Sequence, residues 1–199
     1  MTTIRDPAAR QRIVEIAARV VAESGVRGAT IRAIATAGGV TTGYITHYFV
    51  DKQALISEVI RHTNLNAERR VRQAIADAGG GIAALEAAIE VMLPLDAGRL
   101  QEWRVWTAVW REPSLGDEYS AGYRTGWDGL RNIFSALLDA AVTSGDLDPA
   151  TEVEFEAERL VTMLAGAGLL AGVQEPERAR AVTSRMLKEQ VRALIGPCA

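Results

Sequence analysis

The sequence predicts an all-α protein of about nine helices. Three observations support this fold class. Apolar residues recur at helical spacing along the chain, no segment alternates apolar and polar residues as a half-buried strand does, and capping residues mark most helix ends. The chain has 199 residues, of which 48% are hydrophobic and 24% charged. This length allows a sizeable buried core, and this composition is that of an ordinary globular protein.

Capping residues and helix breakers divide the chain into these helices. Asp6 followed by Pro7 has the pattern of an N-cap and a first helical residue, and Ser24-Gly25 ends that helix. Asp51 caps a long helix that runs to Ala78, where three glycines break it. The other expected helices are 30–37, 41–48, 82–94, 98–111, one reaching Ser144 from a cap at Ser114–Asp117, one opened by Asp148-Pro149, and one from Pro176 to Gly196-Pro197.

Residues 30–52 predict a helix-turn-helix, because Gly38-Gly39-Val40 separates two short helices. Val40 and Ile45 are expected to staple the start of the second short helix, and Val50 and Leu55 the start of the long helix. Phe49 is expected in the core of this small unit.

The second short helix keeps a hydrogen-bonding face without acidic residues. This face consists of Thr41, Thr42, Gly43, Tyr44, Thr46, His47 and Tyr48. Such a helix suits DNA, since phosphates and base edges need hydrogen-bond donors and repel carboxylates. Arg32 and Lys52 add positive charge, and the first backbone amides of the long helix are expected to hold a phosphate.

The net charge of −3 conceals an asymmetry along the chain. Residues 1–72 carry 11 Lys and Arg against 6 Asp and Glu, a balance of +5, whereas residues 73–199 carry 11 against 19, a balance of −8. The basic segment contains the predicted helix-turn-helix, so the overall acidity does not exclude a nucleic-acid partner.

Residues 8–56 resemble the DNA-binding domain of the TetR/AcrR family of bacterial transcriptional regulators. The resemblance rests on motifs at Ala17–Gly25, Thr30–Ala35, Ala37–Val40, Thr41–Gly43, His47–Phe49 and Asp51–Leu55. It implies a helix-turn-helix domain at 1–52 and a larger helical ligand-binding and dimerisation domain at 53–199. It also implies DNA contacts from Thr30, Arg32, Thr41, Thr42, Gly43, Tyr44, His47, Tyr48 and Lys52. The family commonly has tyrosine where this chain has Thr46, so one phosphate contact is expected to be lost or altered.

Aromatic residues in the C-terminal part have two interpretations. Trp103, Trp106 and Trp110 fall on one stripe of a helix, which is typical of core packing. The alternative is the wall of a pocket for a small-molecule inducer, formed by Met92, Trp103, Trp106, Trp110, Tyr123, Trp127, Phe134 and Met163. Such a wall suits an organic cation, but Arg104, Arg111 and Arg124 suit an anion, so the ligand stays open. The segment from Trp103 to Leu187 is similar to regulators of the choline–betaine (BetI) type.

The last two expected helices serve either burial within one chain or a dimer interface. The stretch Leu160–Val173 is apolar almost all round, and the final helix also has an apolar stripe. The family resemblance implies a four-helix interface between two subunits, with Leu160, Leu164, Gly168, Val182, Met186 and Val191 in it. A two-fold dimer would match a palindromic operator in double-stranded DNA.

Residues of metal and catalytic sites are scarce. The two histidines, His47 and His62, and the single cysteine, Cys198, make no metal cluster of usual spacing and no internal disulfide. The carboxylates of Glu152–Glu158 are interpreted as a solvated helix start. No cofactor, metal or enzymatic activity is expected, although an all-helical enzyme and a dimeric module without DNA binding remain rival interpretations.

The remaining expectations concern location and overall role. The longest uncharged stretch near the C-terminus, Leu160–Gln174, is shorter than a membrane-spanning helix, and the N-terminus lacks the apolar segment of a secretory signal. A cytoplasmic protein without a membrane partner is therefore expected. Together with the resemblance, the sequence predicts a homodimeric one-component regulator, of the repressor kind, which binds a palindromic operator and is released by a small-molecule ligand.

Overall fold

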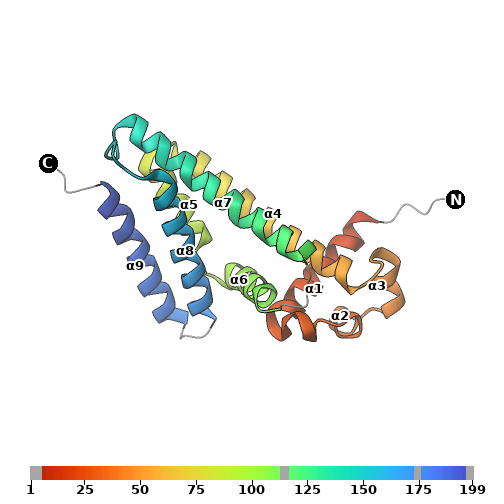
Figure 1. Cartoon of the computed structure of the whole chain (residues 1–199). Coiled ribbons are helices and arrows are strands. Elements are labelled where there is room, and N and C mark those ends of the chain that lie inside the picture. The colour runs from red at the N-terminus through yellow and green to blue at the C-terminus, as the bar shows by residue number, and fades with distance from the viewer. Residues whose placement is uncertain (1–5, 113–116, 173–175, 196–199) are drawn as a thin grey trace. The chain divides into compact units, whose positions relative to one another are not determined.

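The computed structural model describes residues 6–112, 117–172 and 176–195, with side chains for 6–112, 124–172, 181–182 and 184–195. These residues form nine α-helices and no β-strand, which confirms the predicted fold class (Figure 1). The helices are α1 (Pro7–Gly28), α2 (Ile31–Gly38), α3 (Thr42–Tyr48), α4 (Lys52–Ala78), α5 (Gly81–Met92), α6 (Ala97–Trp110), α7 (Asp117–Ser144), α8 (Val153–Ala171) and α9 (Pro176–Ile195). They pack as two compact units. The first unit consists of Met1–Leu65 and Gln101–Tyr123, and the second of Asn66–Leu100 and Arg124–Ala199.

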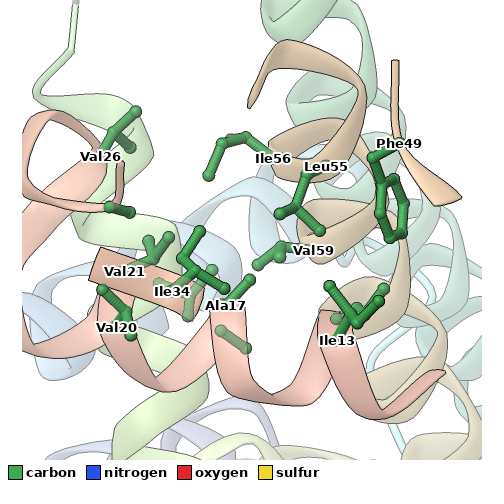
Figure 2. Packing of buried hydrophobic residues seen from close by; sticks show 14 of the residues in the cluster. Ile13, Ala17, Val20, Val21, Val26, Ile34, Phe49, Leu55, Ile56 and Val59 are labelled. Atoms are coloured by element: carbon green, nitrogen blue, oxygen red, sulfur yellow. The ribbon is translucent and has the colours of Figure 1, made fainter. Parts of the chain in front are cut away.

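One hydrophobic core holds the first unit together. Figure 2 shows side chains of α1 and of the first turns of α4 pointing toward one another, with Ile34 of α2 beside them. Ile45 of α3 and Val105 and Val109 of α6 belong to the same core. Full burial of a Val, Leu or Ile side chain stabilises a fold by roughly 1.5–3 kcal/mol, so this core is the main attractive contribution to the unit.

The compact units do not follow the predicted division into 1–52 and 53–199. The core of the helix-turn-helix is completed by Leu55, Ile56 and Val59 of α4, which lie beyond Lys52 and are fully buried. Helix α6 also packs on this core, although it lies far away in the sequence. Helices α1, α2 and α3 leave an apolar face open, and residues from both α4 and α6 close it.

Caps and glycines mark several of the helix ends that the sequence predicts, although α1 continues past its predicted end at Gly25 to Gly28. Asp6 Oδ1 accepts the N–H of Ala8 at 2.9 Å, and Asp51 Oδ1 accepts the N–H of Ala54 at 2.7 Å. Gly25 has a φ of 70° and interrupts α1, whereas Gly39, with a φ of 62°, caps the C-terminus of α2. Both glycines occupy the left-handed region, which a side chain would strain.

The predicted staple of Val50 against Leu55 is wrong. Val50 is 85% exposed, and Phe49, which is 2% exposed, enters the core instead. Phe49 has extended backbone angles, and successive side chains of an extended segment point to opposite sides. Burial of Phe49 therefore turns Val50 outward.

The start predicted for α8 at Asp148-Pro149 is also wrong. Helix α8 begins at Val153, because Asp148 closes a separate turn in which its carboxylate accepts the N–H of Ala150 at 2.7 Å and its carbonyl accepts the N–H of Thr151 at 2.9 Å. The cap predicted at Ser114–Asp117 includes residues outside the described ranges.

In the second unit, α8 packs along α9, and α9 also contacts α5. Glu156, in the first turn of α8, is only 8% exposed. Its carboxylate pairs with Arg159 at 3.0 Å and accepts a hydrogen bond from Gln190 Nε2 of α9 at 3.2 Å. Glu156 thus departs from the predicted solvated helix start and joins α8 to α9.

No helix within the described ranges is long and apolar enough to cross a membrane. Among the same residues, His, Cys, Asp and Glu side chains form no group of three or more that is suited to a metal ion.

Two arginines, one from α1 and one from α4, pair with Glu58 of α4. Arg10 Nη1 of α1 donates to Glu58 Oε1 at 2.8 Å, and Arg61 of α4 donates to both carboxylate oxygens. Burial by itself would raise the pKa of Glu58, but hydrogen bonds and charge from the two guanidinium groups outweigh it and lower the pKa from 4.5 to about 2. Ionised Glu58 therefore stabilises the packing of α1 on α4.

We expect Glu58→Gln to make the stability of the first unit less dependent on pH. Because the folded pKa of about 2 lies below the reference value of 4.5, the stabilisation by Glu58 is present above pH 4.5 and is lost as the pH falls toward 2. At pH 7 the free energy of unfolding should fall by about 1–2 kcal/mol. Urea unfolding followed by circular dichroism measures the free energy of unfolding of the wild type and of Glu58→Gln. The difference between the two proteins should become smaller between pH 5 and pH 3. A difference as large at pH 3 as at pH 7 would contradict the assignment, and Glu86→Gln, at an exposed acid of α5, is the control.

Candidate nucleic-acid interface

Helix α3 presents one face to solvent and one residue to the core. Ile45 is the buried residue of α3, with none of its surface exposed. At 3.6 residues per turn, Gly43 and His47 lie on the opposite side of the helix, flanked by Tyr44 and Thr46. All four are exposed, as is Thr42. Packing of Ile45 thus turns the predicted recognition face outward.

Thr30 and Thr41 each begin one helix of the helix-turn-helix. Thr30 Oγ1 accepts the N–H of Ala33, and Thr41 Oγ1 accepts the N–H of Tyr44, both at 3.1 Å. In each cap the hydroxyl oxygen is the acceptor, so the hydroxyl proton can still be donated to a phosphate. The first turns of α2 and α3 contain no acidic residue, so the partial positive charge of these N-termini is not neutralised there.

Tyr44, His47 and Tyr48 form an aromatic cluster on α3. The Tyr48 ring lies edge-to-face against Tyr44, with centroids 5.5 Å apart, and against His47, with centroids 5.0 Å apart. Tyr44 is 37% exposed, whereas Tyr48 packs partly on the core. Burial, and then the neighbouring Tyr44, raise the pKa of Tyr48. Tyr44 is therefore the more accessible of the two predicted tyrosine contacts.

Thr46 stands where the TetR/AcrR family commonly has tyrosine. Its hydroxyl donates to the Gly43 carbonyl at 3.2 Å, so the proton is used within the helix. With that bond in place, Thr46 presents a methyl group and acceptor lone pairs rather than a donor. Such a side chain cannot replace a phosphate contact by a tyrosine hydroxyl.

The predicted cations and helix amides differ in availability. Arg32 is exposed in the first turn of α2. The Asp51 carboxylate already accepts the N–H of Ala54, so this carboxylate occupies part of the anion site predicted at the first amides of α4. The Lys52 ammonium lies 3.4 Å from the carbonyl oxygen of Arg27. Because the Asp51 carboxylate occupies part of this anion site, the Lys52 ammonium is the group at the start of α4 that can attract a phosphate.

The surface around α2 and α3 is free of acids over a long stretch of sequence. Residues 24–50 contain Arg27, Arg32 and His47 but no Asp or Glu. Exposed hydroxyls, an imidazole, two capped helix starts and two guanidinium groups together form a surface suited to phosphates and base edges.

Comparisons with known proteins identify the family of this chain. Residues 13–59 match the family described as bacterial regulatory proteins, tetR family, and residues 81–196 match the family described as BetI-type transcriptional repressor, C-terminal. The chain belongs to the TetR family of bacterial transcriptional regulators. Its C-terminal part is of the BetI type, as the sequence resemblance predicts.

Relatives and solved structures match most of this TetR-family chain. The HTH-type transcriptional regulator PksA of Bacillus subtilis is 28% identical over 81% of this chain and 78% of its own length. BetI of Cronobacter sakazakii is 26% identical over 93% of this chain and 92% of its own length. A crystal structure of a transcriptional regulator from Rhodococcus sp. Rha1 is 26% identical, with a TM-score of 0.81 over 94% of this chain and 95% of that one. A structure described as a transcriptional regulator from Saccharomonospora viridis in complex with choline has a TM-score of 0.87 at 22% identity, over 94% of this chain and 97% of that one.

The residues predicted to bind a ligand are divided between the two units of the TetR-family fold. Trp103, Trp106 and Trp110 lie on α6 in the first unit. The Trp103 ring meets Trp106 and Trp110 edge-to-face, and Trp106 Nε1 donates to Asn64 Oδ1 of α4 at 2.9 Å. The second unit contains Met92, Trp127, Phe134 and Met163. The side chain of Tyr123 lies outside the described ranges.

The residues predicted at the dimer interface also separate into two groups. Leu160, Leu164, Gly168 and Val191 are buried within the chain itself. Val182 and Met186 of α9 are 46% and 51% exposed. In this conformation only the last two are accessible to a partner, because the other four are buried within the chain.

One ion pair near the predicted interface was not foreseen from the sequence. Arg27, beside the helix-turn-helix, pairs with Glu112 at 2.8 Å. The two residues are separated by 85 positions. No periodicity or capping pattern connects residues so far apart, so only the fold brings them together.

We expect Gly43→Ala to weaken DNA binding without harming the fold. A Cβ at Gly43 would meet only Thr41 Oγ1, at 3.8 Å, so packing within the chain does not require glycine there. Alanine should leave the free energy of unfolding unchanged or raise it by up to about 1 kcal/mol. The added methyl group would stand between the α3 backbone and the duplex and should cost roughly tenfold in affinity, measured by fluorescence anisotropy.

The matched control for this substitution is Gly129→Ala. Gly129 is an exposed glycine of α7, where a Cβ would have open space around it. It should show the same stability change and wild-type affinity for DNA. Wild-type binding by Gly43→Ala would show that the α3 backbone does not approach the duplex closely.

Proposed function

We propose that this TetR-family chain is a homodimeric repressor that binds palindromic operator DNA and is released by a small-molecule ligand. The observation that carries the proposal is the acid-free, exposed face of α3, which Ile45 directs away from the core. Matches to the tetR family at residues 13–59 and to the BetI-type repressor family at residues 81–196 support it.

In this proposal, phosphate contacts and base contacts come from different residues. Thr30, Thr41, Tyr48 and Lys52 hold phosphates, because each offers a hydroxyl or ammonium donor near a helix end. Thr42, Gly43, Tyr44 and His47 enter the major groove on the exposed face of α3, and Arg32 reaches a phosphate or a guanine edge from α2.

The ligand in this proposal is a small organic molecule. Tryptophans of α6 and α7 suit the cation–π recognition of a quaternary ammonium group. The choline complex of the structural neighbour from Saccharomonospora viridis favours an organic cation over an anion. Residues proposed for this role are Met92, Trp103, Trp106, Trp110, Tyr123, Trp127, Phe134 and Met163.

Helix α4 is the proposed link between ligand and DNA. It contributes Lys52–Leu65 to the first unit and Asn66–Ala78 to the second. A ligand that binds the conformation unfit for DNA shifts the population toward it, and by linkage the operator lowers the affinity for that ligand.

The proposed dimer interface lies on the exposed apolar surface of α8 and α9. Val182 and Met186 lie one turn apart on α9. Further exposed apolar side chains of the same two helices are Phe155, Leu169, Leu170 and Ile195. A monomer seldom leaves such a set of large apolar groups in water. Leu160, Leu164, Gly168 and Val191 would support this surface from below rather than touch the partner.

The function is tested by binding to duplexes from the promoter region beside the chain's own coding sequence. The wild type should select one palindromic fragment, and its affinity should fall steeply as salt rises, since several phosphate contacts release counterions. Adding choline should release the fragment. The absence of salt-sensitive binding to any fragment would overturn the proposal, and binding that choline leaves unchanged would overturn the organic-cation assignment.

We expect Met186→Asp to divide the dimer into single chains of 21.4 kDa. A carboxylate in an apolar interface loses its water without gaining a partner. Analytical ultracentrifugation measures the mass, and Val50→Asp, which places the same change on an exposed residue of the first unit, should keep the wild-type mass. A wild type that sediments as a monomer, or a Met186→Asp variant that sediments as a dimer, would contradict the proposed interface.

A further inference from the structure

An ion pair ties the end of α1 to the end of α6 inside the first unit. Arg27 Nε donates to Glu112 Oε2 at 2.8 Å, and Arg27 Nη2 donates to Glu112 Oε1 at 3.2 Å. The Glu112 side chain is 8% exposed, whereas that of Arg27 is 80% exposed. Two parallel hydrogen bonds to a carboxylate fixed by burial allow the guanidinium little freedom.

Arg27 lies in the last turn of α1, in the short segment that leads into α2. This segment follows the interruption of α1 at Gly25 and precedes Thr30, the N-cap of α2. Val26 and Ala29 of the segment are buried in the core on either side of Arg27. Apolar packing of these two residues thus holds the segment against the core, and the ion pair with Glu112 fixes the side chain of Arg27.

The carbonyl of Arg27 faces the start of α4. The Lys52 ammonium lies 3.4 Å from this oxygen, a long hydrogen bond. An ammonium has three donors, so a bond to Arg27 leaves two for a phosphate. A free lysine side chain has many rotamers in water, and a phosphate contact must restrict them. The bond to the Arg27 carbonyl already restricts the Lys52 side chain, so less conformational entropy is lost when the phosphate binds.

We propose that Glu112 is a positioning residue for DNA binding, which through Arg27 keeps Lys52 oriented toward the phosphate backbone. The inference rests on the proposed function and on the phosphate contact of Lys52. It assigns to the DNA-binding unit a residue within the part of the chain matched by the BetI-type C-terminal family, residues 81–196. Helix α6 is then part of the apparatus that sets DNA affinity.

Charge alone predicts the opposite effect for a substitution of Glu112. Removing a carboxylate makes the protein more positive, which by itself strengthens attraction to DNA and steepens its salt dependence. If Glu112 positions Lys52, Glu112→Gln instead weakens binding and makes the salt dependence shallower, because one phosphate contact is lost. The sign of the two changes separates positioning from simple electrostatics.

The experiment compares wild type, Glu112→Gln, Lys52→Ala and the double variant by anisotropy on the same operator duplex over a range of salt. Lys52→Ala should weaken binding by roughly 2- to 10-fold and lower the salt slope by about 1. Glu112→Gln should change both in the same direction by a smaller amount, and should add little in the Lys52→Ala background.

Arg27→Lys is the second variant, because Arg27 is exposed and the net charge does not change. Lysine cannot form the two parallel bonds to Glu112, so this variant should also lower affinity and salt slope. Glu86→Gln and Lys188→Ala make matched charge changes at exposed residues of α5 and α9. These controls should leave operator affinity within twofold of the wild type, with the dimer mass confirmed for Lys188→Ala.

The outcomes distinguish this inference from the function on which it rests. A wild type without salt-sensitive binding overturns both. Binding by the wild type that Lys52→Ala weakens, while Glu112→Gln and Arg27→Lys equal the wild type, overturns the inference alone. Tighter binding with a steeper salt slope in Glu112→Gln also overturns it, and would identify Arg27 as a phosphate ligand that Glu112 restrains.

Discussion

A seven-residue helix cannot persist in water by itself, because its few hydrogen bonds do not offset the cost of nucleation. The orientation of α3 therefore depends on Ile45, which lies in the core that α1, α2, α4 and α6 share. Gly43 and His47 face outward because they lie opposite this one buried side chain. The candidate DNA surface is in this sense a property of the core beneath it.

Carboxylates with little exposed surface fix contacts between segments that are distant in the sequence. Glu58 pairs with Arg10 of α1, Glu112 pairs with Arg27, and Glu156 of α8 accepts a hydrogen bond from Gln190 of α9. Such pairs contribute little net stability compared with apolar packing, but breaking one leaves a charge without its partner in a poorly solvated place. Their effect is to favour one geometry over others.

The distribution of charge has a different meaning at each scale. The chain as a whole carries −3, and yet residues 24–50 contain no acid. Glu112, two residues beyond the end of α6, brings a carboxylate to the edge of this region, and there it is nearly buried and paired with an exposed guanidinium. The exposed face of α3 remains free of carboxylates because the nearby acids are turned inward or bound in caps, as with Asp51.

Local interactions determined most of what could be predicted from the sequence. Caps at Asp6, Thr30 and Thr41 and the left-handed glycine Gly39 act within one turn of their own position, so their patterns are visible in the sequence. The family motifs of the helix-turn-helix are equally local. The fold class, the helix order and the composition of the α3 face therefore followed without coordinates.

Tertiary structure decided the features in which distant residues compete for the same space. The sequence pattern predicted that both Phe49 and Val50 pack against the core, but the extended backbone at Phe49 lets only Phe49 do so. It marked Leu160 and Met186 alike as apolar, but the fold buries Leu160 completely and leaves Met186 51% exposed. It placed Glu112 with the larger domain, whereas burial of Val105 and Val109 brings α6 to the helix-turn-helix. The sequence shows whether a side chain is apolar or charged, and its periodicity indicates the face of the helix on which that side chain lies. Which partner the side chain meets depends on contacts across the whole chain.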